Sequence, residues 1–139
     1  MIHRRFKAME IFFKEGFVTT CFISPIFPKI TQVQEIILKA QDFCHFVYLE
    51  NLNLRGDFKR RILDFIAHNY PSLMPLYEAI YINGDLSFWQ DLDFKLQEFA
   101  KSLGLTYVIN ERKPQVPQGR RPLLINYFYH EKIKKNAKI

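Results

Sequence analysis

The stretch FVTTCFI at residues 17–23 decides the fold class, because it is β-branched, aromatic and almost entirely apolar. Such a run predicts a strand that is covered on both faces within a parallel sheet. Residues 2–15 place apolar side chains at helical spacing, and Gly16 follows where a helix commonly ends. The loop predicted over residues 24–30 rests on Pro25 and Pro28, since proline lacks the amide hydrogen that a helix or a ladder needs.

Helix and strand continue to alternate after this loop. Thr31 and Gln34 have the capping-box pattern that opens a helix, and residues 46–49 predict a second buried strand. Asp57 is predicted to cap the next helix, which should end before Pro71 because the residue before a proline avoids helical geometry. This order of elements is typical of α/β proteins.

The pattern repeats in the second half of the chain. A short helix is predicted over residues 73–81, and a second capping box at Ser87 opens a helix that Gly104 closes. Residues 105–109 then predict a third strand. The fold class is therefore α/β, with about three parallel strands, helices packed on them and right-handed crossovers.

The charge is unevenly divided, which suggests a boundary near residue 110. Residues 1–110 are balanced, whereas residues 111–139 hold eight basic and two acidic residues and account for the net charge of +6. We expect a βα unit over residues 1–110 and a basic C-terminal segment, containing prolines and aromatics, over residues 111–139. The basic tail is either a site for nucleic acid, held by salt-sensitive phosphate contacts, or a solvated terminus.

Three strands would leave two open sheet edges, which are a hazard for aggregation. A missing part of the chain, a partner or the apolar segment at residues 123–129 should cover them. We therefore predict that the isolated chain associates with itself or folds this C-terminal segment across an exposed edge.

Composition bounds the function further. The 139 residues suit one domain, and no apolar run approaches the roughly 20 residues of a membrane span. Cys21 and Cys44 lie in apolar surroundings, which favours reduced, buried thiols in a cytoplasmic protein. No glycine cluster offers a phosphate-binding loop, and Cys44 beside His45 lacks the second ligand pair that a zinc site needs.

The loops that follow the first two strands carry the most informative polar residues. In parallel α/β folds, ligands bind at the carboxyl ends of the strands. Glu50, Asn51, Asn53 and Arg55 supply acceptors, donors and a cation within six residues. Equally, the two asparagines could satisfy their own turn while Arg55 remains an exposed charge.

Four stretches of the sequence, RRFKA at residues 4–8, SPIFPKIT at 24–31, LENLNLRG at 49–56 and YFYHEKIK at 127–134, resemble radical S-adenosylmethionine (radical SAM) enzymes. The last two are similar to a subgroup near the spore photoproduct lyases. This resemblance implies the C-terminal portion of a partial (β/α) barrel, whose complete members hold a [4Fe-4S] cluster and cleave S-adenosylmethionine. The family's Cys-x3-Cys-x2-Cys motif is absent from this chain, so we expect no cofactor in the chain alone and no activity without the missing half-barrel.

The resemblance also assigns candidate residues. Ser24 and Pro25 match the end of the fifth barrel strand, and Glu50 and Asn51 match the end of the sixth. The candidate cofactor-binding residues are therefore Ser24, Pro25, Glu50, Asn51, Asn53 and Arg55. Two other hypotheses stay open: an interaction module that binds nucleic acid or protein through its basic tail, and a small enzyme in which Glu50 and His130 act as acid and base.

Overall fold

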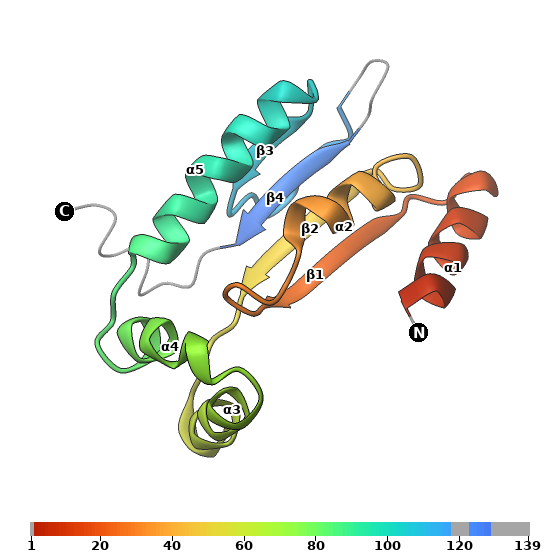
Figure 1. Ribbon diagram of the computed structural model, residues 1–139. Coiled ribbons are helices and arrows are strands. Elements are labelled where there is room, and N and C mark those ends of the chain that lie inside the picture. Colours follow the sequence, from red (N-terminus) through yellow and green to blue (C-terminus); the bar gives the residue numbers. More distant parts are fainter. Residues whose placement is uncertain (1, 118–122, 129–139) are drawn as a thin grey trace.

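The computed structural model describes residues 2–117 and 123–128. The chain alternates helices and strands, as the sequence predicts, and Figure 1 shows their arrangement. The elements in chain order are α1 (Ile2–Lys14), β1 (Thr20–Ile26), α2 (Val33–Ala40), β2 (Phe46–Asn51), α3 (Gly56–Asn69), the 3-10 turn η1 (Pro71–Leu73), α4 (Met74–Tyr81), α5 (Ser87–Ser102), β3 (Thr106–Ile109) and β4 (Leu124–Phe128).

The strands form one parallel sheet of four strands in the order β1-β2-β4-β3. The predicted α/β class and the parallel sheet are confirmed, but the count of three strands was one too few. The apolar segment near the C-terminus forms β4, which pairs with β2 on one side and with β3 on the other. This segment therefore pairs along the edges that β2 and β3 would otherwise expose, and it does so from an interior position with a ladder on both sides, whereas self-association of the chain stays a prediction.

The strand order also differs from that of a simple barrel, in which successive parallel strands are neighbours. Here β4 lies between β2 and β3, although it follows both in the chain. Within the described residues, β1 and β3 form the two edges of an open sheet.

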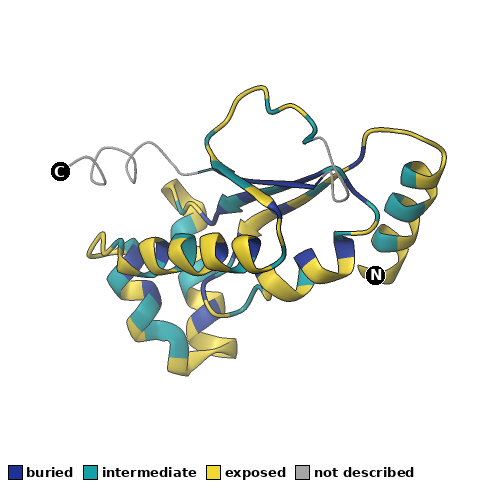
Figure 2. Cartoon of the chain, turned by 90° about the horizontal axis from the view of Figure 1, so that it is seen from above, coloured by how far each residue is buried: buried dark blue, intermediate teal, exposed yellow. Residues whose placement is uncertain are grey.

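One face of the sheet is covered by helices and the other is not. Figure 2 shows α2 and α5 on the same side of the sheet, where they enclose the main core. That core includes Ile37 and Leu96 from the helices and Val47, Leu49 and Ile125 from the strands. No described helix lies on the opposite face, so the prediction that the first strand is covered on both faces was wrong: Phe22 is 57% exposed.

A second, smaller core lies beyond the carboxyl ends of the strands. It joins Leu52, Ile66 and Tyr77, and it packs α3 and α4 beneath this edge of the sheet (Figure 1). The loops after β1 and β2 are thereby held between the sheet and the two helices.

The first strand begins and ends three residues later than predicted. β1 runs through Ser24 and Pro25, which are joined by a cis peptide bond, so the predicted loop was wrong for residues 24–26. Proline is tolerated because β1 is an edge strand and its pairing with β2 is irregular between Ile23 and Ile26.

The helix ends are confirmed, but the predicted caps are not. Gly16 and Gly104 adopt the left-handed conformation, with φ of 87° and 66°, which glycine accommodates without strain. The hydroxyl of Thr31 accepts a hydrogen bond from the Phe27 amide at 2.9 Å instead of capping α2. Asp57 lies within α3, which starts at Gly56 without a side-chain cap.

The predicted Ser87 does not cap α5: Leu86 occupies the N-cap position without a side-chain cap, and the preceding Asp85 supplies the acceptor instead. Asp85 Oδ1 accepts a hydrogen bond from the Ser87 amide at 2.9 Å, and Ser87 itself is the first helical residue. Short polar side chains compete for the same backbone donors, so the pattern locates the start of the helix to within about two residues.

Among residues 2–117 and 123–128, no helix combines the length and apolar character needed to cross a bilayer.

Candidate functional site

The candidate residues Ser24 and Glu50 lie together near the carboxyl ends of β1 and β2. The Ser24 hydroxyl donates a hydrogen bond to Glu50 Oε2 at 3.1 Å. Strand register explains this contact, because β1 and β2 run parallel and their facing residues alternate between the two faces of the sheet. Ser24 is exposed and Glu50 is half-buried, so the carboxylate keeps a route to a ligand.

Asn51 belongs to the opposite face of the sheet. It is almost completely buried, and its Oδ1 accepts a hydrogen bond from the hydroxyl of Tyr127 on β4. Burial raises the pKa of Tyr127, so this phenol remains a protonated donor at neutral pH. The structure therefore separates Asn51 from the pair of Ser24 and Glu50.

Asn53 and Arg55 lie in the loop between β2 and α3, and both are exposed. Arg55 has extended backbone angles at the residue preceding α3. Within the described part of the chain, its guanidinium makes no ion pair. Arg55 is thus placed where an anionic group could bind it in two-pronged fashion.

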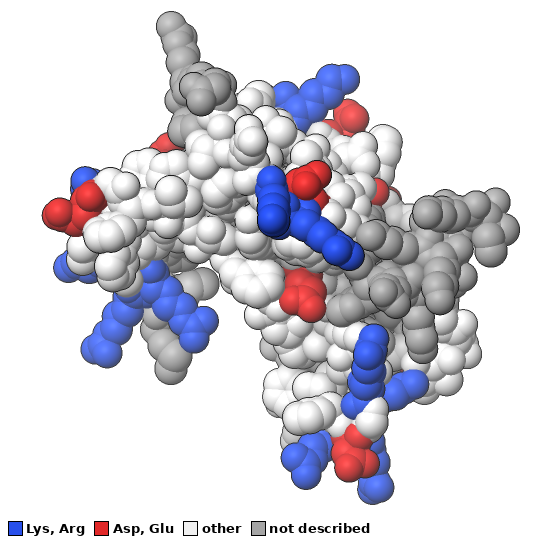
Figure 3. All heavy atoms as spheres, turned by 180° about the vertical axis from the view of Figure 1, so that it is seen from behind, with Lys and Arg blue, Asp and Glu red and all other residues white. Residues whose placement is uncertain are grey.

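A row of three aromatic side chains, which the sequence pattern did not predict, lies on the uncovered face of the sheet. The Tyr48 ring on β2 makes two edge-to-face contacts. Its centroid lies 6.4 Å from that of the Phe22 ring on β1 and 5.4 Å from that of the Phe128 ring on β4. Figure 3 views the molecule from behind and shows a mostly uncharged surface with basic and acidic groups near its middle. We call the side chains of Phe22, Tyr48 and Phe128 the aromatic row.

The signal for this row was present in the sequence. Phe22 precedes Ser24 by two residues, and Tyr48 precedes Glu50 by two, which is the period that puts residues on one face of a strand. The alternation along the strands does not indicate that this face of the sheet lacks a covering helix.

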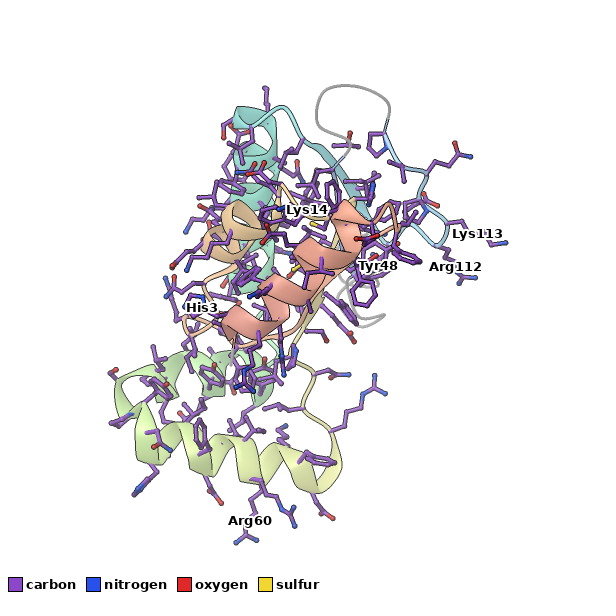
Figure 4. The ribbon with its side chains drawn as sticks, turned by 90° about the vertical axis from the view of Figure 1, so that its right-hand side faces the viewer. His3, Lys14, Tyr48, Arg60, Arg112 and Lys113 are labelled. Atoms are coloured by element: carbon purple, nitrogen blue, oxygen red, sulfur yellow. The ribbon has the colours of Figure 1, made fainter. Side chains whose placement is uncertain are left out.

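A second missed residue, Asn126 of β4, holds the loop that follows β3. Its Nδ2 donates a hydrogen bond to the Glu111 carbonyl at 2.8 Å, and its Oδ1 accepts one from the Glu111 amide at 3.2 Å. This double contact brings the exposed Arg112 and Lys113 to the side of the sheet that bears Tyr48, away from the helices (Figure 4).

Tyrosine hydroxyls also hold the loops at the carboxyl edge. The Tyr77 hydroxyl donates to the Pro28 carbonyl at 2.9 Å, and the Tyr81 hydroxyl donates to the Leu52 carbonyl at 2.8 Å. Burial raises the pKa of both phenols, which keeps them protonated. Through these two hydrogen bonds, helix α4 fixes the position of the loop after β1 and of the loop after β2.

Both cysteines are free thiols; Cys44 is buried, as predicted, whereas Cys21 is only half-buried. Burial raises the pKa of Cys21 to about 11 and that of Cys44 to about 12, and the Cys44 thiol donates to the Ala40 carbonyl at 3.2 Å. Within the part of the chain that the structure describes, no three His, Cys, Asp or Glu side chains could together hold a metal ion. This donor set does not fit an iron–sulphur cluster, which requires thiolates.

The acid–base hypothesis with Glu50 involves His130, which lies outside the described residues, as do Tyr129 and most of the basic tail.

The chain is similar to an uncharacterised protein of Methanocaldococcus jannaschii, MJ0683, with 34% identity over 68 residues. The match covers 49% of this chain and 26% of that relative, so the matched segment spans about a quarter of the relative's length. No family model and no solved structure matches the chain. The similarity assigns neither a family nor an activity.

Proposed function

We propose that this chain is the C-terminal part of a radical SAM enzyme, inactive by itself, and that it supplies strands on the cofactor and substrate side of a partial (β/α) barrel. One observation carries the proposal: helices cover one face of a parallel sheet, while the other face is free of described helices and bears the aromatic row beside Ser24 and Glu50. A (β/α) barrel is built in this way, with helices outside and functional side chains at the carboxyl ends of its strands.

The chemistry of this face suits an adenosine group. Aromatic rings stack on nucleobases, and a carboxylate that already accepts one hydroxyl can accept further hydrogen bonds from a ribose or an amine. Arg55 could meet the carboxylate of the methionine moiety. When S-adenosylmethionine is bound and reduced in a complete enzyme, it supplies a 5′-deoxyadenosyl radical, and the electron must come from a cluster held outside the described residues.

The first experiment is a titration of the isolated chain with S-adenosylmethionine, followed by NMR. We expect shifts at Ser24, Tyr48 and Glu50, and their loss in Glu50→Ala. Arg60→Ala is a matched control, because Arg60 is exposed on α3 and, among the described residues, its one ion pair is a loose 3.9 Å approach of its Nε to Asp64 Oδ2. Figure 4 shows Arg60 pointing away from the sheet. Shifts elsewhere, or none at millimolar ligand, would contradict the proposal.

The second experiment examines the genomic DNA upstream of the codon for Met1 in every frame. The proposal expects a Cys-x3-Cys-x2-Cys motif in frame or in an adjacent gene. Co-expression of that segment with this chain should then give the absorbance of a [4Fe-4S] cluster and reductive cleavage of S-adenosylmethionine. Absence of the motif would remove radical chemistry from consideration.

One observation favours a second function, the binding of nucleic acid. Arg112 and Lys113 lie on the side of the sheet that bears Tyr48, and exposed aromatics beside cations suit single-stranded oligonucleotides (Figure 4). Binding of a fluorescent oligonucleotide should then weaken steeply as salt rises from 50 to 200 mM, as expected when several phosphates are neutralised. Binding that is absent or insensitive to salt would reject this alternative.

A further inference from the structure

A groove runs between helix α1 and the outer edge of β1. Its volume is about 460 Å³, and it is lined by apolar side chains of α1, such as Phe6 and Met9, and by seven consecutive residues at positions 19–25. Figure 1 shows α1 standing beyond the edge of the sheet, whereas α2 lies over it. The groove thus follows an edge strand along its length.

The backbone of β1 turns hydrogen-bonding groups toward this groove. The Thr19 carbonyl accepts from the amides of His45 and Phe46, on the β2 side. Backbone groups alternate in direction along a regular strand, and the pairing of β1 with β2 is regular as far as Ile23, so the amides and carbonyls of Thr20 and Phe22 face the other way. No described strand pairs with this edge.

The position of α1 bears on which occupant the groove would fit. The C-terminal end of α1 is anchored: the Phe13 ring lies 4.9 Å from the His45 imidazole, and Lys14 Nζ lies 5.9 Å from the Phe43 ring. α1 runs antiparallel to β1, so its N-terminus lies level with the carboxyl end of β1 (Figure 1). This is the geometry of a crossover helix that connects a preceding parallel strand to β1.

Large apolar side chains around the groove remain in contact with water. Phe12 and Phe22 line the groove and are 55% and 57% exposed, and Phe17, whose ring contacts that of Phe12, is 59% exposed. Contiguous apolar surface of this kind marks a surface that another polypeptide covers.

We propose that the groove between α1 and β1 binds one extended strand, parallel to β1, from the cluster-bearing part of the proposed enzyme. The backbone of that strand pairs with Thr20 and Phe22, and alternate apolar side chains fill the space under α1. Pro25 limits the pairing at the carboxyl end, since it has no amide hydrogen. This inference rests on the proposed function and names the surface through which the two parts join.

Charge favours this occupant over a second copy of the chain. α1 carries Arg4, Arg5 and Lys7 in its first half and no acidic residue in its first turn. A symmetric pair of β1 edges would place two such helices face to face, which is unfavourable for like charges. The strand that binds should therefore bring acidic residues near Arg5, which itself lines the groove.

The test uses the full chain with a tethered probe strand. The sequence Glu-Val-Thr-Val-Thr-Val-Thr is fused before Met1 through a short Gly/Ser loop, and amide hydrogen exchange is followed by NMR. We expect the amides of Thr20 and Phe22 to exchange about tenfold more slowly, with little change at Cys21 and Ile23, which already face β2. A matched fusion with prolines at alternate probe positions should give no protection.

Each outcome decides the inference. The amide of Val108 in β3 reports whether the sheet is intact. If it stays protected while the β1 amides of the fusion gain no protection, the proposed strand binding is overturned. Protection of the unfused chain that grows with protein concentration would show that a second copy occupies the groove, and would also overturn it. The titration with S-adenosylmethionine is independent, so ligand binding without strand protection would reject only the groove, and the reverse would reject only the cofactor site.

Discussion

The phenol of Tyr127, on β4, donates its hydrogen to the side-chain carbonyl of Asn51 at the end of β2, 76 residues earlier in the chain. Both side chains are buried on the helix-covered side of the sheet. The contact ties the last described strand to the start of the loop that carries Asn53 and Arg55. Integrity of the candidate loop therefore depends on a segment that is distant in sequence.

Tyr127→Phe should destabilise the fold by about 1–3 kcal/mol, because it deletes a buried hydrogen bond without changing the packing of the ring. Urea denaturation would measure the loss. Tyr70→Phe is the matched control, since Tyr70 is exposed, and it should leave the free energy of unfolding nearly unchanged. Equal effects of the two substitutions would contradict a structural role for the Tyr127 hydroxyl.

Asn126→Ala should loosen the loop after β3. The substitution removes both hydrogen bonds to the Glu111 backbone, which should cost about 1–3 kcal/mol and speed hydrogen exchange at the Glu111 amide. Asn83→Ala, on an exposed turn, is the control and should change neither quantity. Unchanged exchange at Glu111 in Asn126→Ala would show that the loop is held by other contacts.

Stability should fall as the pH rises above about 9. In the folded chain, burial raises the pKa of Cys21 to about 11 and of Cys44 to about 12, whereas an unfolded cysteine titrates near about 8.5. Between the unfolded and the folded pKa of each cysteine, the unfolded state binds fewer protons than the folded state, so unfolding becomes more favourable with rising pH. Below about pH 8 the protonated thiols contribute fully to stability. Urea midpoints at pH 8 and pH 10 would measure this loss.

The matched variant for that experiment is the double substitution Cys21→Val and Cys44→Ala. It should show a shallower fall between pH 8 and pH 10, because the thiol contribution is gone and the tyrosines, whose folded pKa is raised, begin to lower stability only near about pH 10, where the unfolded phenols lose their protons. In the unmodified chain at pH 8, iodoacetamide should label Cys44 far more slowly than in urea, because the thiolate is scarce and buried. Rapid labelling of the folded chain would contradict the raised pKa.

Asp85→Ala should lower the melting temperature at neutral pH by removing the acceptor for the first amide of α5. The hydrogen bond from the Ser87 amide, followed by that from its hydroxyl, lowers the pKa of Asp85. A lowered pKa stabilises the fold above the unfolded value near about 3.9 and loses this effect as the pH falls through the folded value. The difference between the two proteins should therefore shrink at about pH 2.

Asp85→Asn separates the charge from the cap. It retains a carbonyl acceptor for the Ser87 amide, so it should lose less stability than Asp85→Ala at neutral pH and vary less with pH. If both variants match the unmodified chain at pH 7, the carboxylate does not cap α5.

Local chemistry in the sequence determined the helices and the first three strands. Apolar β-branched runs prefer extended backbone, and Gly16 and Gly104 end helices because glycine adopts positive φ at little cost. The same reasoning located the polar loops after β1 and β2. These preferences act over a few residues, which is why they can be derived without knowledge of the fold.

Tertiary structure decided where the strands lie and which face is covered. The insertion of β4 between β2 and β3, the pairing of Ser24 with Glu50 and the seclusion of Asn51 all depend on contacts between distant segments. Alternation along a strand distinguishes two faces, but it carries no information about which one the helices bury. That choice follows from the burial of apolar area and the pairing of backbone groups summed over the whole chain, and no short stretch of sequence contains it.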